Sequence, residues 1–269
     1  MLISLTAQGY GLVETGDFGS LVSISLEDGK FTSRELLEDA YLAGVSSSGE
    51  RLVVFSRSNG SKINITTPEG EVVRTIAPTV RGMTFVEAEL SPDGAQIAFV
   101  GNFAGFSEKP APFGIQLLTL DGKLRTLVPT PDRQHSQSIG WSKDSRRIVY
   151  DTGNRIFIFD LSNGSSEFFA DGNHPAWSPD GEWIGYVGLD GYAHVVSPDR
   201  ARSRKVLDRV KLGRGLRWSP DSRYMLYADW RGIEVLDLST NRTATVYHPI
   251  DPQVTEARFC WVHRGTVHQ

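Results

Sequence analysis

Cysteine is almost absent from this chain of 269 residues, in which Cys260 is the single example. One cysteine cannot form an internal disulfide, so the fold must be held by packing and hydrogen bonds. No segment approaches the ~18 consecutive apolar residues of a membrane helix, and MLISLTAQGYG at the start lacks the features of a signal peptide. We therefore expect a soluble chain without membrane insertion, located in the cytoplasm, or in the periplasm if a leader has been removed.

A strong excess of one charge is also missing, because the formal net charge is -4. This balance argues against a nucleic-acid-binding protein. The charges are unevenly distributed, however. Residues 200–217 carry eight basic side chains against the single acid Asp208. We interpret this basic segment as edge protection of an outer strand, with an acidic protein or peptide partner as the alternative.

Helical periodicity is rare, and a repeated turn motif takes its place. The copies are VSSSG (45–49), LSPDG (90–94), WSKDS (141–145), WSPDG (177–181), WSPDS (218–222) and a degraded WVHRG (261–265). Their mean spacing is about 43 residues, which is typical of a propeller blade of four strands. Runs rich in β-branched residues follow each turn and predict antiparallel strands.

The chemistry of the motif predicts a tight hairpin. Proline presets φ for the first central position of a type I turn, and the serine hydroxyl is expected to accept the N–H two residues further on. The last residue is expected in the left-handed conformation that suits glycine. Ser145 and Ser222 replace that glycine, which predicts a modest strain. The large apolar residues before the turns, such as Trp177, are expected to pack between blades.

The two ends of the chain complement each other. The strand-like segment LVSISLEDG (21–29) has no turn motif before it, whereas the turn motif at 261–265 has no strands after it. The sequence therefore predicts one all-β domain over residues 1–269, a six-bladed β-propeller with four-stranded antiparallel blades. Its ring would be closed by a blade that the N- and C-termini share, which removes free sheet edges.

The repeat resembles a known family. The pattern W-S-P-D-G-x-x-[IL]-x-[YF], followed by I-x-[VIL]-x-D-L-x-x-G, is similar to the TolB-type, WD-repeat-like propellers of bacteria, and RWSPDSRYMLYADWRGIEVLDLSTN (217–241) is the best match. The resemblance implies a six-bladed propeller, and periplasmic members of the family serve as docking platforms for envelope proteins. It thus implies a non-enzymatic scaffold for protein–protein interaction, with no cofactor and no catalytic residue.

The candidate site lies at the mouth of the central channel, on the face opposite the repeated turns. In such propellers this face holds the loops that enter the innermost strands and those that follow the second strands. Polar and aromatic residues of these loops predict binding of a peptide terminus or a small polar ligand. They are Glu87, His135, Gln137, Asp151, His174, Arg214, Asp229, Trp230 and Arg258.

A second candidate contact is the longest loop, NFAGFSEKPAPFG (102–114). Phe103, Phe106 and Phe113 stand in it among glycines and prolines, and exposed aromatic residues favour interfaces. The alternative is that these rings fold back onto their own blade.

The rival hypothesis is a small hydrolase or lyase with a metal or polar site in the channel. Glu87, His174 and Asp229 would be its participants. The mouth positions mix glutamate, glutamine, histidine and arginine without the regular array that a catalytic metal needs. We therefore expect no metal and no enzymatic activity.

Overall fold

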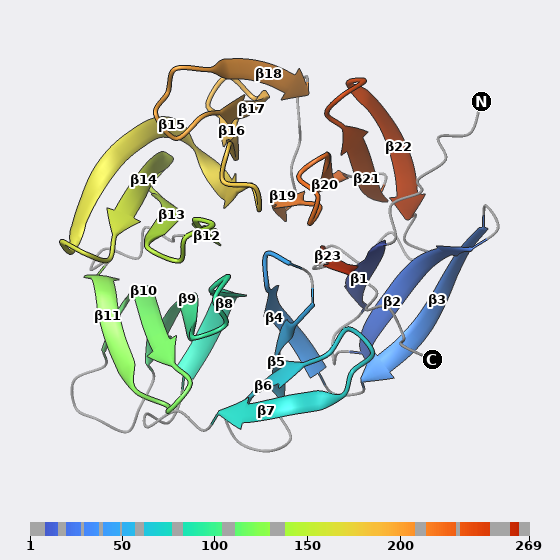
Figure 1. Cartoon of the computed structure of the whole chain (residues 1–269), viewed down its shortest axis with the longest axis horizontal. Helices are drawn as coiled ribbons and strands as arrows, with labels where there is room; N and C mark the ends of the chain where they lie inside the picture. The colour runs from blue at the N-terminus through green and yellow to red at the C-terminus, as the bar shows by residue number, and fades with distance from the viewer. Residues whose placement is uncertain are drawn as a thin grey trace.

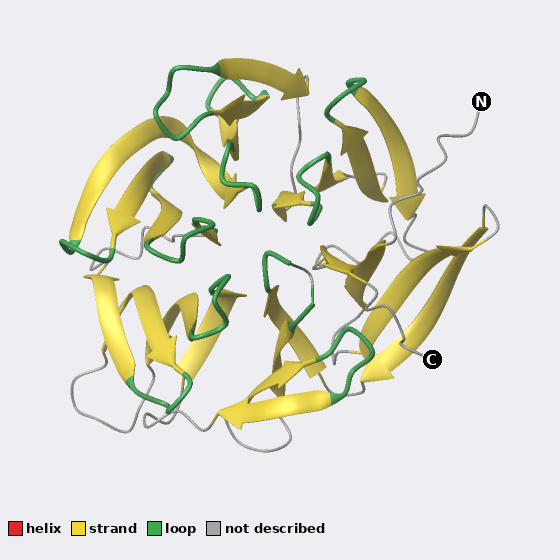
Figure 2. Cartoon of the chain, viewed as in Figure 1, coloured by secondary structure: helices red, strands yellow, loops and turns green. Residues whose placement is uncertain are grey.

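The structure, a computed structural model, describes residues 9–15, 20–27, 30–37, 40–48, 50–56, 62–76, 83–103, 111–129, 138–207, 214–229, 232–247 and 259–263. This part of the chain consists of strands and turns and contains no helix (Figure 2). Accordingly, no helix that could cross a membrane is found among the described residues. The expectation of an all-β chain is confirmed.

The strands pair antiparallel throughout, in sheets of four or seven strands. One sheet has the order β23 (Phe259–His263), β1 (Gly9–Thr15), β2 (Ser20–Glu27) and β3 (Lys30–Leu37). The next comprises β4 (Ala40–Val45), β5 (Leu52–Ser56), β6 (Lys62–Thr66) and β7 (Val72–Ile76). The third comprises β8 (Met83–Leu90), β9 (Gln96–Phe103), β10 (Ala111–Thr119) and β11 (Leu124–Pro129).

The second half of the chain forms the remaining sheets. A seven-stranded sheet runs through β12 (Ile139–Trp141), β13 (Arg147–Thr152), β14 (Arg155–Asp160), β15 (Ser165–Trp177), β16 (Ile184–Gly188), β17 (Ala193–Val196) and β18 (Ser203–Leu207). The last comprises β19 (Arg214–Trp218), β20 (Tyr224–Asp229), β21 (Gly232–Asp237) and β22 (Arg242–Tyr247).

The sheets stand around a common centre (Figure 1). The strands nearest the centre contact one another in the order β4, β8, β12, β15, β19, β23, and β23 contacts β4. The core lies between the faces of neighbouring sheets. Val53 of β5, for example, packs in one cluster with Leu90 and Phe99 of the adjacent sheet. Burial of these apolar faces supplies most of the driving force for the arrangement.

The turns between the first two strands of a sheet share one hydrogen-bond pattern. In the β8–β9 turn the Ser91 hydroxyl donates to Asp93 Oδ1 at 2.6 Å and accepts the N–H of Gln96 at 3.0 Å. The N–H two residues beyond the aspartate, that of Ala95, bonds to Asp93 Oδ1. The sequence-based assignment of the serine as acceptor for the N–H two residues further on is therefore wrong. The Ser91 hydroxyl accepts the N–H of Gln96, five residues further along the chain, rather than the N–H two residues further on.

Two of these turns carry serine where glycine was expected, and the serine has a second role. Ser145 and Ser222 have φ values of 58° and 59°, so the left-handed conformation predicted for this position is present. Each hydroxyl accepts a backbone N–H from the neighbouring turn, Ser145 from Asp93 at 3.1 Å and Ser222 from Asp180 at 3.0 Å. A bond between sheets thus offsets the strain of the left-handed residue.

The tryptophans before the turns pack between sheets, as the sequence predicts. Trp141, Trp177 and Trp218 are 2%, 5% and 8% exposed. The Trp141 indole N–H donates to the Glu89 carbonyl, and that of Trp218 donates to the Ala176 carbonyl, both at 3.0 Å. Each bond joins the innermost strands of adjacent sheets, so these rings supply both buried area and a directed link.

β15 takes part in two sets of pairings. Its first half, up to Asp171, pairs with β14, and its second half, from Gly172, pairs with β16. The strand bends at Gly172, where φ is 153° and an added Cβ would lie 2.4 Å from the Val187 carbonyl oxygen. The short 36-residue spacing between the turns WSKDS and WSPDG follows from this continuity, because no loop separates the two halves.

Candidate functional site

The centre of the molecule is charged. Glu87 on β8 and Arg217 on β19 are 130 residues apart in the chain, and Glu87 Oε1 lies 2.6 Å from Arg217 Nη2. Glu87 is 8% exposed, and β8 and β19 approach the centre from opposite sides in Figure 1. The Arg217 side chain is 28% exposed, so the pair is reached by solvent from its basic end, whereas removal of Arg217 would leave the buried Glu87 carboxylate unpaired.

Glu89 adds a second carboxyl group to this cluster. Its Oε2 accepts the backbone N–H of Trp141 at 2.9 Å. Burial is the main cause that raises the pKa of Glu89, Arg217 and the Trp141 N–H lower it, Glu87 raises it by a smaller amount, and the resulting pKa is about 8. Glu89 is therefore largely protonated at neutral pH and titrates just above it. The centre holds one firm ion pair and one carboxyl group that is able to gain or lose a proton near neutrality.

Sequence reasoning missed Glu89 and Arg217, although a signal for them exists. Both stand one residue before the large apolar residue of the turn motif, and the equivalent residue is Gly44 in one sheet and Gly140 in another. A Cβ on Gly44 would lie 1.5 Å from the Ala88 carbonyl oxygen. The residue before the large apolar residue therefore lies against the innermost strand of the next sheet. A long charged side chain at this position, as in Glu89 and Arg217, departs from the glycine found in those two sheets.

A second polar cluster contains two of the predicted residues, Asp151 and His174. The two Asp151 carboxylate oxygens accept backbone N–H groups from Ser138 at 3.0 Å and from His174 at 3.1 Å. The Ser138 hydroxyl lies 3.3 Å from His174 Nδ1. His174 has a φ of 54°. Asp151 therefore fixes the entry into β12 together with the bend of β15, and it joins two neighbouring innermost strands.

These three residues do not have the geometry of a hydrolytic triad. In a triad the acid orients the imidazole ring through a ring N–H, whereas Asp151 bonds to the backbone N–H of His174. Ser138 is 1% exposed, so its hydroxyl is closed to a substrate. Among the described residues, no group of three or more His, Cys, Asp and Glu side chains could hold a metal ion. The contacts that the structure describes for this cluster support the backbone.

Only some of the other predicted site residues belong to the described part of the chain. Arg214 begins β19 and Asp229 ends β20, but their side chains lie outside the described part. Phe103 ends β9 and Phe113 belongs to β10, where Ala111 pairs with Phe103. The 102–114 segment is thus shorter as a loop than expected. His135, Gln137, Arg258, Trp230 and Phe106 fall outside the described residues.

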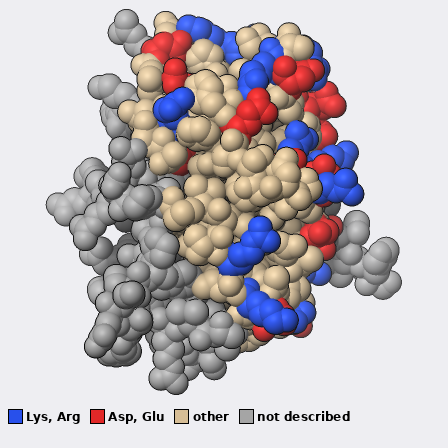
Figure 3. Space-filling view, turned by 90° about the vertical axis from the view of Figure 1, so that its left-hand side faces the viewer, with Lys and Arg blue, Asp and Glu red and all other residues tan. Residues whose placement is uncertain are grey.

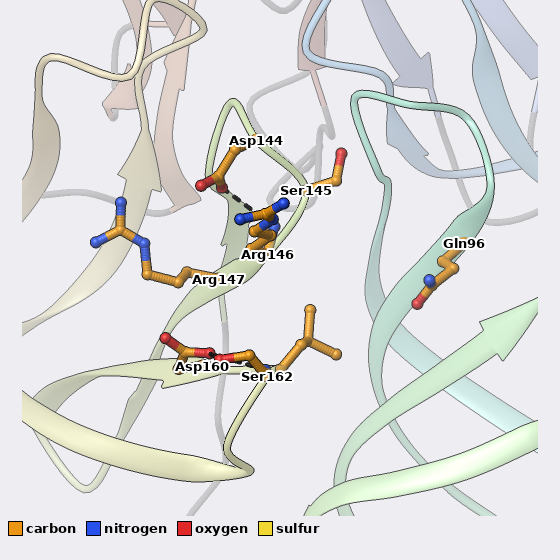
Figure 4. A pocket seen from close by; sticks show the side chains of 8 residues that line it. Gln96, Asp144, Ser145, Arg146, Arg147, Asp160 and Ser162 are labelled. Atoms are coloured by element: carbon orange, nitrogen blue, oxygen red, sulfur yellow. Dashed lines mark hydrogen bonds between the residues drawn. The ribbon is translucent and has the colours of Figure 1, made fainter.

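A cavity of ≈ 450 Å³ lies on the side of the repeated turns, which sequence reasoning excluded from the search (Figure 4). It is polar and lies between the β8–β9 turn and the hairpins of β12, β13 and β14. Its lining consists of Gln96, Asp144, Ser145, Arg146, Arg147, Asp160, Leu161 and Ser162. Asp160 accepts bonds from Ser162, and Asp144 Oδ1 accepts the N–H of Arg146.

Several basic residues of the segment predicted as an alternative contact form ion pairs. Arg200 pairs with Glu167, Arg202 pairs with Glu182 and Lys205 pairs with Asp190, each at 2.7 Å. On the side of the molecule that Figure 3 shows, which is the left-hand side of Figure 1, acidic and basic side chains are likewise interspersed. These pairs favour the interpretation of the segment as a protected outer edge. Exposed pairs of this kind contribute little to stability.

Comparison with known proteins identifies the fold. No protein-family model matches the sequence. No curated protein matches it either. Among solved structures, TolB from Acinetobacter baumannii has a TM-score of 0.68 at 14% identity, covering 94% of this chain and 66% of its own length. The putative TolB from Agrobacterium tumefaciens has a TM-score of 0.64 at 15% identity, covering 96% of this chain and 99% of its own.

At such identities the similarity concerns the fold alone. The chain spans slightly less than two thirds of the Acinetobacter structure, so a substantial part of that protein has no counterpart in it. The similarity extends over nearly the whole of this chain in both comparisons. Together with the antiparallel sheets around a common centre, it shows that this chain has a TolB-like β-propeller fold.

Proposed function

We propose that the chain is a six-bladed propeller in which the blade of β23, β1, β2 and β3 joins both ends of the chain. Three observations support this interpretation. The β23–β1 pairing sets Cys260 opposite Leu12. The seven-stranded sheet divides into two four-stranded units when β15 is counted in each. The contacts of the innermost strands form a continuous cycle. Closure of this kind leaves no innermost edge open.

The function that fits the site best is a non-enzymatic scaffold that binds a protein or peptide at the central opening. The observation that carries the proposal is the Glu87–Arg217 pair, which together with Glu89 gathers a guanidinium group and two carboxyl groups at the centre. The acidic or basic end of a partner segment would exchange ion pairs with this cluster. Specificity would then come from charge complementarity. The predicted mouth residues and the phenylalanines of 102–114 would form the surrounding contact surface.

The location follows the same reasoning. The expectation of a cytoplasmic protein has no support from the structure or the comparisons. The fold is similar to that of TolB proteins, whose family resemblance implies a periplasmic docking platform. We therefore propose a periplasmic location, with an envelope protein as the partner.

Affinity capture from the native source, followed by mass spectrometry, tests the proposal with a charge-swapped variant. Glu87→Arg combined with Arg217→Glu keeps an ion pair at the centre but reverses its polarity. We expect the fold to persist and the captured partner of the wild-type chain to be lost. Arg204→Glu, on the outer strand β18, is the matched control and should capture the same partner as the wild type. Equal capture by the swapped variant would remove the central cluster from the binding site.

Enzymatic activity is tested on the same samples. The rival hypothesis of a channel hydrolase or lyase predicts that a divalent ion stabilises the native chain, because a ligand that binds only the folded state raises the melting temperature. We expect no shift with Ca²⁺, Mg²⁺, Mn²⁺ or Zn²⁺. A shift that the Glu87→Arg/Arg217→Glu variant loses would favour the rival.

A further inference from the structure

The outer edge of the β4–β7 sheet differs from the other outer edges that the structure describes. β7 is the last strand of its sheet and lies at the rim of the molecule in Figure 1. Val72 and Val73 at its start are 51% and 53% exposed. They are the one adjacent pair of exposed large apolar residues within the described chain. Such a strand edge is a ready template for pairing with another strand.

The exposure of both valines has a structural cause. Thr66 pairs with Val72 and Ile65 pairs with Arg74, so Val73 has no partner in the β6 register. The irregularity disturbs the alternation that would otherwise turn one of two consecutive side chains toward the core. As a result the first four residues of β7 are exposed, and Ile76 alone is buried. The edge therefore presents backbone groups and apolar surface together.

The charges that flank the valines are arranged symmetrically. The sequence Glu71-Val72-Val73-Arg74 has an acid at one end and a base at the other. When two copies of this segment pair antiparallel about a point between the valines, Glu71 of each copy faces Arg74 of the other, and Val72 faces Val73. Opposite charges and β-branched residues in facing positions both stabilise a strand pair.

The outer strand β18 provides a contrast. Its centre carries Arg204 and Lys205, so the same self-pairing of two copies would bring like charges together. Like charges in facing positions destabilise a strand pair. β18 is thus protected against its own copy, whereas β7 is complementary to itself.

We infer that β7 is a self-association surface, at which a second copy of this chain adds its own β7 in antiparallel orientation. The interface is isologous, so each Glu71–Arg74 contact occurs twice. Its area is limited to one strand edge, and interfaces of that size give weak, concentration-dependent dimers. In the monomer Arg74 Nη2 donates to the Leu120 carbonyl at 3.1 Å. Pairing would exchange this exposed bond for the ion pair with Glu71 of the other copy, so the strand-edge hydrogen bonds and the facing valines supply most of the gain.

Sedimentation equilibrium of four chains tests the inference. The wild-type chain should dimerise as its concentration rises. Glu71→Lys and Arg74→Glu each replace two attractive contacts by two repulsive ones, so each should weaken dimerisation roughly 10- to 100-fold. The double variant Glu71→Lys/Arg74→Glu should dimerise like the wild type, because the facing charges are again opposite.

Mixing the two single variants gives the sharpest readout. The introduced lysine of the Glu71→Lys chain would face the introduced glutamate of the Arg74→Glu chain, and the two unchanged residues of the pair would also face each other with opposite charges. An equimolar mixture should therefore form a heterodimer although neither variant dimerises alone. Circular dichroism checks that each variant is folded, and Arg204→Glu on β18 should dimerise like the wild type. A monomeric wild-type chain, or single variants that dimerise unchanged, would overturn the inference.

Discussion

Two hairpin regions of this molecule have nearly the same backbone but different side-chain contacts. In the first, the Leu161 N–H donates to the Arg146 carbonyl at 2.9 Å, and in the second the Leu238 N–H donates to the Arg223 carbonyl at 3.1 Å. Asp160 and Asp237 each accept the N–H of the serine two residues further on, at 2.8 Å. The regions differ in the arginine, because Arg223 pairs with Asp237 at 3.1 Å, whereas among these described residues no such pair joins Arg146 to Asp160.

The neighbour of the arginine explains the difference. The Arg223 guanidinium lies over the Tyr224 ring, 4.9 Å from its centroid, and this ring holds it close to Asp237. The equivalent of Tyr224 is Arg147, which lies over the Trp177 ring instead. Arg146 thus has a second positive charge, rather than a ring, as its neighbour in the chain. This region is the one that lines the cavity of Figure 4. The aromatic residue thus accompanies the ion pair, and its replacement by Arg147 accompanies the cavity.

The largest effect is expected when the supporting ring is removed. Tyr224 is 4% exposed, so Tyr224→Arg should bury a charge, release Arg223 and reduce the free energy of unfolding by about 3 kcal/mol. Chemical denaturation with a constant m-value would measure it. Tyr224→Phe, which keeps the ring, should lose much less. An equal loss for both variants would contradict the role of the ring.

An effect that is small per pH unit, and visible in the pH dependence of stability, is expected at the centre. The pKa of Glu89 is about 8 in the folded chain and 4.5 as its ordinary value. The folded state therefore binds a proton that the unfolded state has lost, and stability should fall as the pH rises between these values. The slope is on the order of 1 kcal/mol per pH unit. Glu89→Gln should flatten this dependence of stability on pH, measured by denaturation at several pH values between the two pKa values. A variant that keeps the wild-type slope would exclude Glu89 as its source.

The carboxylates of the two hairpins make stability depend on pH in the opposite direction. Burial raises the pKa of Asp237, but bonds from Ser239 and Arg223 outweigh it and hold the value at about 2, below the ordinary 3.8. The stability that Asp237 contributes is present above pH 3.8 and is lost as the pH falls toward 2. Asp237→Asn should cost about 2 kcal/mol at neutral pH and remove this part of the acid sensitivity. Asp160→Asn should cost less, because it breaks no ion pair with Arg146. Equal losses of unfolding free energy for Asp237→Asn and Asp160→Asn, measured by acid and denaturant titration, would contradict this difference between the hairpins.

The smallest effect tests whether the cavity can be closed. Arg147→Tyr should place a ring beside Arg146 and allow the Arg146–Asp160 pair to form, which would replace the lowering of the Asp160 pKa that Arg147 now contributes. Stability should change by no more than about 0.5 kcal/mol, since the contact of Arg147 with Trp177 is lost at the same time. A structure of the variant measures the separation of the Arg146 guanidinium and the Asp160 carboxylate directly. A separation beyond ~4 Å would show that the ring alone does not set the ion pair.

Much of the fold is predictable from local sequence. The turns have a local chemistry, because three copies of the motif carry proline and four carry aspartate before a glycine or serine, and Ser222 adopts the positive φ expected at that last position. The burial of Trp141 follows in the same way from its place before a turn. The sequence does not predict which N–H the turn serine accepts, because that depends on the three-dimensional geometry of the hairpin. It does not predict the continuity of β15 either, because a glycine is typical of a loop as well as of a bend within a strand.

The candidate site was less accessible to such reasoning. Glu87 and His174 were identified as polar residues near the centre, but their partners depend on contacts between distant parts of the chain. The Arg217 partner of Glu87 lies 130 residues away. Asp151 is predicted as a contact residue, which stays a prediction, and the structure adds that its carboxylate accepts two backbone N–H groups. A sequence pattern gives the position of such a side chain but not its tertiary partner.

The continuity of β15 has a consequence for how the molecule could be rearranged. Circular permutation and domain insertion succeed where an exposed loop can be opened, and the junction between the two halves of β15 is strand instead. The residues around Gly172 carry backbone bonds to both neighbours, including the Gly172 N–H to the Asn154 carbonyl at 2.8 Å. The strands from β12 to β18 thus form a tandem unit that duplication or exchange would have to move as a whole.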